Sequence, residues 1–312
     1  IMASLEKLID ERISRLESVP ETLQTAIDKQ SIELFKAIKS ELNSLEIVDG
    51  KIVASSANFN RIGNIIEKLK QAVFNKDYVD AITAFAKEIG AQAGLNDQIL
   101  EKIVGSFSSD ALYGEAIKAA QKNALMMLDD GAVQQELLQP IADFLSNSIT
   151  SGADFLDTVD QLKAKLVGEN SLLSKYAGRY VKDVFAVSDR QYVKLTAERH
   201  GIEFYKWSGG TVKDTRVMCN ERHGHIYHKD EIADWGNGNK RDASLERPKL
   251  LYTTPAGVKV YWEGMNYDTN GATIFSLAGG YNCNHILLPV ATEYVPKADL
   301  NRAIALGYYK DN

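Results

Sequence analysis

The chain has 312 residues, enough for about two domains of ordinary size. Hydrophobic residues make up 45% and charged residues 25%, proportions typical of soluble globular proteins rather than disordered or fibrous ones. The net charge of −6 argues against a surface devoted to nucleic acid, which needs clustered Lys and Arg. No apolar run approaches the ~18 residues of a membrane-spanning helix, and the opening residues include acids. We expect a soluble protein made in the cytoplasm, with no membrane segment.

Over most of the first 170 residues, apolar side chains recur at helical spacing. One apolar stripe runs over residues 5–16 and a second over 27–45. Pro20 lies between them at a position that suits the first turn of a new helix, which predicts a break there. In EIVDGKIV, residues 46–53, an Asp-Gly pair separates two short β-branched runs and predicts a tight hairpin.

Helical periodicity resumes after this hairpin. Ile62, Ile65, Ile66, Leu69 and Val73 form one apolar face. We expect Asp77 to cap the next helix and Gly90 to end it. Further helical segments are expected at about 97–105, 108–128, 132–148, 154–167 and 171–200.

The composition changes after His200. All three tryptophans, both cysteines and four of the six prolines lie beyond this point. Strand-like runs occur at 202–208 and 258–262, separated by turns rich in Gly and Asn. We therefore predict an α+β fold: a mainly helical N-terminal region over 1–170, a long connecting helix over 171–200, and a small domain with short antiparallel strands over 201–312.

Reactive side chains are concentrated in one stretch of the second part. The chain has only two cysteines and five histidines, yet one cysteine and three histidines fall within ten residues. A Cys219-x3-His223 pair could meet a Cys283-x-His285 pair, and together they would form a Cys2His2 zinc set. These spacings are not those of common zinc motifs, so two other interpretations stay open.

The first alternative is structural. Cys219 and Cys283 would be buried small hydrophobes, and the histidines, including His225 and His228, would be surface or hydrogen-bonding residues. The second alternative is catalytic: a Cys219 thiolate with a nearby histidine, or Asp214, Glu221 and a histidine-bound metal that hydrolyse a phosphodiester. Neither a Gly-rich phosphate loop nor an H-E-x-x-H or G-x-S-x-G motif accompanies them.

Two elements occur in order between about residues 190 and 290. The first contains Trp207, Asp214-Thr-Arg216 and Cys219-Asn-Glu-Arg-His-Gly224, and it continues to Ile232. The second contains Trp262-Glu-Gly264, Gly279-Gly280-Tyr-Asn-Cys283-Asn-His285 and Leu288-Pro289-Val290. In this combination the chain resembles the C-terminal domain of the phage Mu F-like minor head proteins, also called phage head morphogenesis proteins. It has Asn284 where that family usually has Arg.

The resemblance implies a structural minor head protein of a tailed bacteriophage. Such a protein belongs to the virion head near the portal, where it acts in head assembly and DNA packaging or delivery, and it is found in the host cytoplasm during assembly. The resemblance implies no enzymatic activity. The implied partner is the phage portal protein, and the major capsid protein, scaffold proteins and packaged DNA are further candidates. The amphipathic N-terminal helices would supply the partner-binding surface.

The resemblance also selects residues. Cys219, Cys283 and His285 are the ligands that it favours for a structural zinc. It disfavours His223 and His225, whose positions are expected to vary across the family, and only the residue spacing keeps His223 as a candidate. Asp214 and Arg216 either tie loops together or form a surface ion pair worth ~0–1 kcal/mol. The motif as a whole comprises Trp207, Asp214, Arg216, Cys219, Gly224, Gly279, Gly280, Cys283 and His285.

These residues predict that the cluster stabilises a fold rather than performing chemistry. The Gly279-Gly280 pair offers the positive-φ freedom for a sharp turn into Cys283. The competing functions are a metal-dependent hydrolase or toxin-like enzyme that uses the Cys/His cluster, and a nucleic-acid-binding packaging factor, which the acidic balance disfavours.

Overall fold

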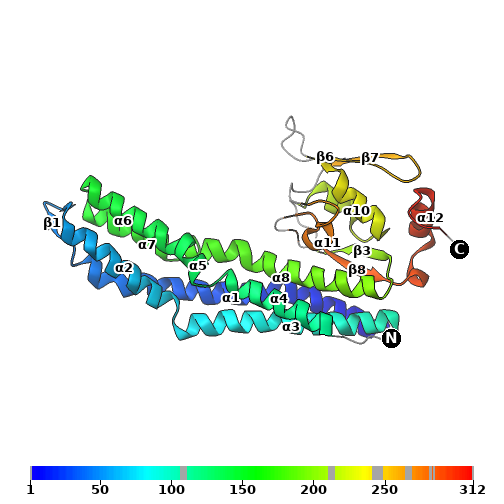
Figure 1. Cartoon of the computed structure of the whole chain (residues 1–312), viewed down its shortest axis with the longest axis horizontal. Helices are drawn as coiled ribbons and strands as arrows, with labels where there is room; N and C mark the ends of the chain where they lie inside the picture. The colour runs from blue at the N-terminus through cyan, green and yellow to red at the C-terminus, as the bar shows by residue number, and fades with distance from the viewer. Residues whose placement is uncertain are drawn as a thin grey trace. The chain divides into compact units, whose positions relative to one another are not determined.

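The structure is a computed structural model, and it describes residues 2–105, 111–209, 215–240, 249–263, 269–280, 283 and 285–310. The described chain is mostly helical, with long N-terminal helices and small antiparallel sheets in its C-terminal region (Figure 1). The predicted α+β class is confirmed. No helix among these residues has both the length and the apolar character needed to cross a membrane.

The chain divides into two compact units. The mixed unit comprises Ile1–Leu16, Ile89–Ala120 and Asp183–Asn312, and the helical unit comprises Glu17–Glu88 and Gln121–Lys182. The units interleave along the sequence, because four helices (α1, α3, α4 and α8) each contribute residues to both. The division in chain order, at about residues 170 and 200, stays a prediction.

The first helix, α1 (Met2–Leu42), continues through Pro20, so the predicted break is wrong. A proline inside a helix removes one backbone donor and crowds the preceding turn, at a cost of ~3 kcal/mol or more. In the helical unit, Leu23, Ile27 and Leu34 lie on the buried face of α1. Because each such side chain contributes ~1.5–3 kcal/mol on burial, packing outweighs the local signal of the proline.

The predicted hairpin is present. Strands β1 (Ile47–Val48) and β2 (Lys51–Ile52) pair antiparallel, and the turn residues Asp49 and Gly50 have φ angles of 51° and 78°. Two consecutive positive φ angles define the turn type that Asp-Gly pairs favour. The outer edge of β2 is also used, since the N–H of Ile52 donates to the carbonyl of Ala153 at 2.9 Å.

Local capping explains where the next helices begin and end. Helix α2 (Ser56–Val73) follows Ser55, whose hydroxyl accepts the N–H of Asn58 at 3.2 Å. Helix α3 (Lys76–Val104) is capped by Asn75, which accepts the N–H of Tyr78 at 3.0 Å, and Asp77 lies in its first turn.

The predicted end of α3 at Gly90 is wrong. Glycine inside a helix costs only ~1 kcal/mol relative to alanine, and Ala93, Ile99 and Leu100 beyond it are buried. The helix ends instead at Val104, and Gly105 directly after it has a φ angle of 77°. The expected segment 97–105 is therefore the end of α3.

The remaining helical segments follow the expected order. The segment expected at 132–148 is divided into α5, a π-helical turn η1 and α6, and the long connecting helix is α8. Their bounds are α4 Ala111–Met126, α5 Asp130–Val133, η1 Gln134–Leu138, α6 Gln139–Ser151, α7 Phe155–Leu166 and α8 Leu172–Arg199.

The mixed unit contains two three-stranded antiparallel sheets. The first has the order β4-β3-β8 and the second the order β5-β6-β7. Trp207 of β3 lies opposite Leu287 of β8, and it is buried with Trp235 in the core of the unit. The strands are β3 Phe204–Ser208, β4 Ile226–His228, β5 Asn239–Lys240, β6 Lys249–Thr253, β7 Lys259–Glu263 and β8 Ile286–Val290.

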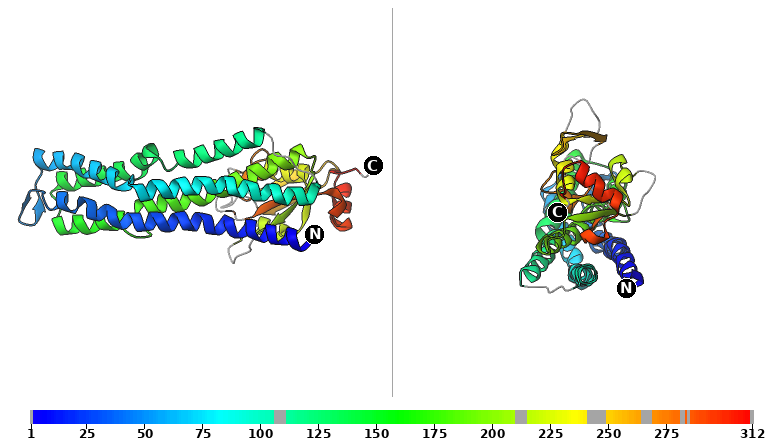
Figure 2. Two further views of the ribbon diagram at one scale, coloured as in Figure 1. Left: turned by 90° about the horizontal axis from the view of Figure 1, so that it is seen from below. Right: turned by 90° about the vertical axis from the view of Figure 1, so that its right-hand side faces the viewer.

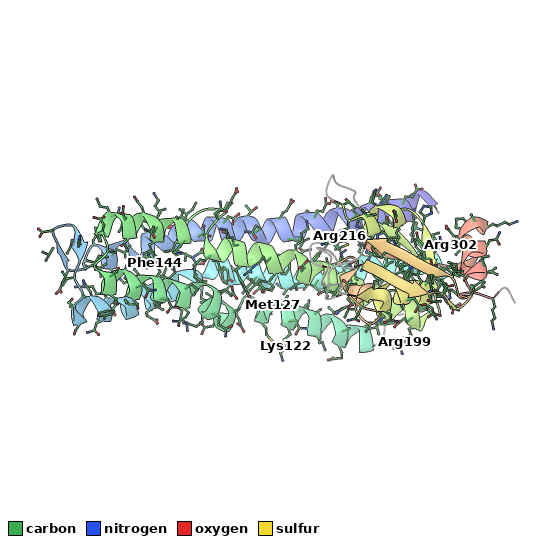
Figure 3. All side chains as sticks on the ribbon, turned by 90° about the horizontal axis from the view of Figure 1, so that it is seen from above. Lys122, Met127, Phe144, Arg199, Arg216 and Arg302 are labelled. Carbon is green, nitrogen blue, oxygen red and sulfur yellow. The ribbon has the colours of Figure 1, made fainter. Side chains whose placement is uncertain are left out.

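Short helices cover these sheets. Helix α10 contacts both β4 and β6, and α12, drawn in red in Figure 2, contacts β4. Arg302 of α12, labelled in Figure 3, lies 4.1 Å from the centre of the Tyr227 ring and donates to the carbonyl of Ile226 at 2.6 Å. The bounds are α9 Val217–Arg222, α10 Lys229–Gly238, α11 Ile274–Leu277, a 3-10 turn η2 Thr292–Tyr294, and α12 Lys297–Ala305.

Candidate metal centre

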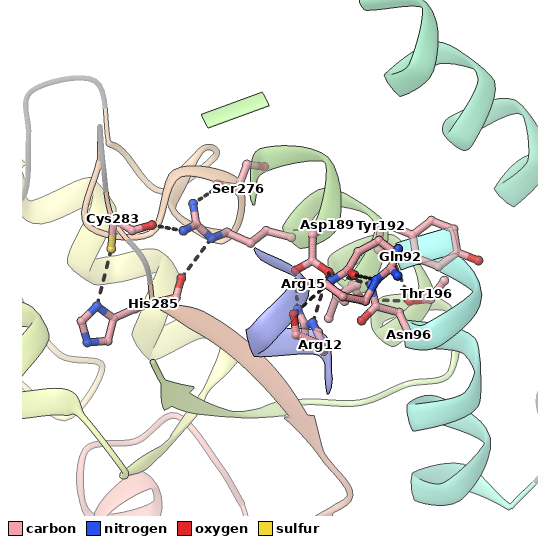
Figure 4. Close-up of polar contacts among 12 residues, drawn as sticks. Arg12, Arg15, Gln92, Asn96, Asp189, Tyr192, Thr196, Ser276, Cys283 and His285 are labelled. Atoms are coloured by element: carbon pink, nitrogen blue, oxygen red, sulfur yellow. Dashed lines mark hydrogen bonds and ion pairs between the residues drawn. The ribbon is translucent and has the colours of Figure 1, made fainter. Parts of the chain in front are cut away.

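Three buried side chains of the mixed unit bring their donor atoms together. Cys219 belongs to α9, and Cys283 and His285 lie between α11 and β8. The two Sγ atoms are 3.9 Å apart, and His285 Nδ1 is 3.8 Å from Cys283 Sγ (Figure 4). All three donor atoms lie within 4.8 Å of one another. The two cysteines, 64 positions apart in sequence, therefore share one site.

Backbone geometry around Trp207 positions Cys219. Gly224 follows α9 with a φ angle of 83°, and its N–H donates to the carbonyl of Trp207 at 2.8 Å. The N–H of Trp207 in turn donates to the carbonyl of His225 at 3.0 Å. This exchange pairs the chain after α9 with β3, and the Trp207 ring stacks on His285 with a centroid distance of 5.9 Å and an interplanar angle of 26°.

Two glycines shape the loop that carries Cys283. Gly280 has a φ angle of 94°, and its carbonyl accepts the N–H of Cys283 at 3.0 Å. The sequence predicted that both glycines supply positive φ angles, but Gly279 is needed for a different reason. A Cβ atom there would lie 2.8 Å from Cys219 Sγ and 3.1 Å from Cys283 Sγ, so the absence of a side chain lets the backbone approach both sulfurs.

Arg190 of α8 also binds this loop by hydrogen bonds. Its guanidinium donates to the carbonyls of His285 and Ser276, each at 3.0 Å, and to the carbonyl of Cys283 (Figure 4). The side chain is buried. Sequence reasoning missed this residue, because nothing in the sequence of α8 separates it from an exposed arginine such as Arg179.

The pKa values of the two thiols are shifted in opposite directions. The hydrogen bond from Cys219 holds the pKa of Cys283 below its usual value; burial opposes this effect, and His285 and the charge of Arg190 support it. The same hydrogen bond, together with burial, raises the pKa of Cys219. The thiolate character of the pair therefore lies on Cys283, with Cys219 as the proton donor.

This arrangement fits a metal ion. Thiolate and imidazole are the donors that zinc prefers, and Zn–S bonds of about 2.3 Å in tetrahedral geometry place two sulfurs about 3.8 Å apart. The observed separation is 3.9 Å, whereas a disulfide would need ~2.05 Å, and both cysteines are free thiols. Among the described residues, His285 Nε2 has no hydrogen-bond partner although it is buried. The group of Cys219, Cys283 and His285 could thus hold a metal.

The other predicted residues lie at different distances from the group. His223 follows α9 and is exposed, with its ring centre 6.1 Å from that of His285. His225 is exposed, and its Nδ1 lies 3.9 Å from Asp299. Arg216 precedes α9, and its Nη1 would lie 3.5 Å from a Cβ at Gly279.

Three candidate residues from the sequence remain: His228, Glu221 and Asp214. His228 is buried in β4, where its Nδ1 accepts the N–H of Asp230 at 3.2 Å, and its ring packs against Phe204. Glu221 is exposed on α9. Asp214 lies outside the described residues.

Comparison of the chain with protein-family models, with curated proteins and with solved structures gave no match. The residues that bear most directly on the function of the chain are the three buried donors and the segments that hold them.

Proposed function

We propose that this chain is a structural minor head protein of a tailed bacteriophage, of the Mu F-like family, acting at the portal vertex in head assembly and DNA packaging or delivery. The proposal is supported by one observation: residues of the two sequence elements lie together in one buried site. Cys219 and Trp207 come from the first element, and Gly279, Cys283 and His285 come from the second, and all five are in one buried site. This supports treating the two elements as one structural module.

Within this proposal, Cys219, Cys283 and His285 hold a structural zinc. A zinc bound by buried side chains contributes directly to folding, because the unfolded chain has no preformed site. The competing hydrolase would need a path by which substrate reaches the ion. The three side chains are only 1%, 5% and 4% exposed, which favours a structural role.

The helical unit is the proposed surface for the portal protein. Several large apolar side chains are exposed there, including Val48 at the hairpin (62%) and Leu156 at the start of α7 (69%). The two segments are joined, since the N–H of Phe155 donates to the carbonyl of Gly50 at 2.9 Å. Contiguous exposed apolar patches mark interaction sites, whereas single exposed apolar side chains are common, so the proposal uses the two joined segments together.

The test is binding of the purified protein to the cognate portal. We expect Val48→Asp and Leu156→Asp to weaken binding by at least about tenfold, because about 1.4 kcal/mol of lost contact gives that factor. Ile32→Asp is the matched control, since Ile32 is an exposed apolar residue of the same unit, on α1. Denaturant midpoints would verify that all three variants fold. Absence of portal binding, with virions of normal number and DNA content assembled without the chain, would reject the proposal.

A separate measurement tests the zinc. Elemental analysis under reducing conditions should give about one zinc per chain, and a chelator should lower the melting temperature. No metal with an unchanged melt would leave the cysteines as apolar core residues and reject the zinc, while the portal experiment would still stand. A metal-dependent hydrolase activity lost in an Asp214→Asn variant of unchanged stability would reject the structural role.

A further inference from the structure

The three buried donors raise the question of the fourth ligand. Zinc in structural sites is held by four protein ligands, whereas catalytic sites keep one position for water or substrate. Cys219, Cys283 and His285 alone would leave one position open. The identity of the fourth ligand therefore decides between a structural and a hydrolytic site.

His223 directly follows α9, four residues after Cys219. Its N–H donates to the carbonyl of Cys219 at 3.1 Å, so the two residues are one helical turn apart, and side chains at positions i and i+4 are neighbours. Cys219 is buried and His223 is exposed. In the described part of the chain the His223 ring makes no hydrogen bond, so turning the ring toward the sulfur breaks none.

The His223 ring already faces the other histidine of the group. Its centre lies 6.1 Å from the centre of the His285 ring, at an interplanar angle of 78°. Two imidazoles bound to one tetrahedral zinc through Zn–N bonds of about 2.0–2.1 Å have ring centres roughly 5 Å apart. A shift of about 1 Å closes this gap, and a side-chain rotation at an exposed position supplies it.

The other two histidines nearby are less suitable. His225 is turned toward Asp299. His228 is enclosed by Phe204 and Tyr309 in a separate apolar cluster, with its Nδ1 already accepting the N–H of Asp230. His223 is thus the histidine in the described sequence that combines helical register with Cys219 and a ring contact with His285.

We propose that His223 is the fourth ligand and closes a Cys2His2 site with Cys219, Cys283 and His285. The inference rests on the zinc of the proposed function. With His223 the zinc has four protein ligands and the site is closed. His223 lies on the exposed side of the site, so it is the last ligand to bind an entering ion and the first to release it.

Zinc affinity of the full chain, measured by competition with a chromophoric chelator, tests the inference. His223→Ala should weaken zinc binding by at least about tenfold, because even partners outside the coordination sphere cost roughly 10–100-fold when removed. His225→Ala, two residues away and also exposed, is the matched control and should bind zinc as the wild type does. Equal melts of the chelated proteins would verify that His223→Ala folds.

Cobalt substitution separates a closed from an open site. In the wild type, the visible spectrum of bound Co²⁺ should be tetrahedral and unchanged by added imidazole. In His223→Ala, added imidazole should occupy the vacated position and restore the wild-type spectrum.

Wild-type affinity in His223→Ala would overturn the inference, as would a wild-type cobalt spectrum that responds to imidazole. Failure of the wild type to bind any metal would overturn it too. None of these results bears on binding to the portal, so the two proposals fail separately.

Discussion

Two adjacent residues of α8 organise two different buried polar groups in the mixed unit (Figure 4). Asp189 accepts hydrogen bonds from Arg12, at 2.7 and 3.2 Å, and from Gln92 and Asn96, each at 2.9 Å. Arg190 donates to three loop carbonyls around the Cys/His group. The first group pairs a carboxylate with a guanidinium, whereas the arginine of the second donates to backbone carbonyls and lies near the thiol pair.

The difference lies in charge compensation. Burial works to raise the pKa of Asp189, but the charge of Arg12 and the hydrogen bonds of the group hold it below its usual value. Burial lowers the pKa of Arg190, and the negative charge of Cys283 opposes this. The Asp189 group is therefore balanced by protein charges alone. The Cys/His group offers three donors that could hold a metal cation.

The largest expected effect is on the balanced group. Asp189→Ala leaves the guanidinium of Arg12 buried without its partner, and breaking a buried ion pair in this way costs about 3–5 kcal/mol. Urea unfolding should show this loss in the free energy of unfolding. Glu115→Ala is the control, because the Glu115–Lys118 pair is exposed, and it should change stability by no more than about 0.5–1 kcal/mol.

A double variant sharpens this prediction. Replacing both charges, as Arg12→Met with Asp189→Leu, removes the uncompensated guanidinium and should recover most of the stability. Equal destabilisation by Asp189→Ala and Glu115→Ala would contradict the view that the buried pair holds these helices.

The next effect concerns the zinc that we propose for the Cys/His group. Cys283→Ser removes a thiolate donor and should abolish the stabilisation by zinc, which amounts to about 2.7–4.1 kcal/mol when free zinc is 100–1,000 times the dissociation constant. Unfolding with and without chelator measures it. The wild type should lose stability on chelation and the variant should not. A chelator effect of the same size in both proteins would contradict Cys283 as a ligand.

How far the sequence predicts the fold depends on whether the signal is local. The Asp49-Gly50 turn was predictable because the two residues alone specify its positive φ angles. Pro20 and Gly90 carry equally clear local signals for breaks, yet α1 and α3 continue through them. Burial of apolar faces on both sides outweighs the cost at one residue, and this burial depends on partners distant in sequence.

The candidate site shows the same limit. Cys219, Cys283 and His285 could be proposed from the sequence because cysteines are few and their segments resemble a known pattern. The Asp189 group could not, because Arg12 and Asp189 are 177 positions apart and look like ordinary charges on amphipathic helices. Arg190 was missed for the same reason, and the effect of Gly279 requires knowing which sulfurs lie beside it.

A smaller effect is expected from crowding the Cys/His group. Gly279→Ala places a Cβ 2.8 Å from Cys219 Sγ, and overpacking of this kind typically costs about 1–3 kcal/mol. Zinc affinity should fall as well, since the sulfurs must move apart. Gly94→Ala is the matched control: apart from its own helix turn, no described atom lies within 4 Å of its added Cβ, and alanine in a helix is more stable than glycine by about 1 kcal/mol. Destabilisation of similar size in both variants would contradict the close approach at Gly279.

The smallest effect concerns His228, the buried histidine of β4. Burial lowers the pKa of His228 below 6.5, and protonation would also break its bond from the N–H of Asp230. The unfolded chain therefore binds the proton first, so this histidine leaves stability unaffected above about pH 6.5 and lowers it as pH falls, by at most about 1.4 kcal/mol per pH unit. His228→Asn keeps an acceptor for Asp230 and cannot titrate. Urea unfolding is measured with chelator present, which removes any metal from His285. The free energy of unfolding of His228→Asn should fall less steeply with decreasing pH than that of the wild type. Parallel slopes would show that the folded protein protonates His228 as readily as the unfolded chain does.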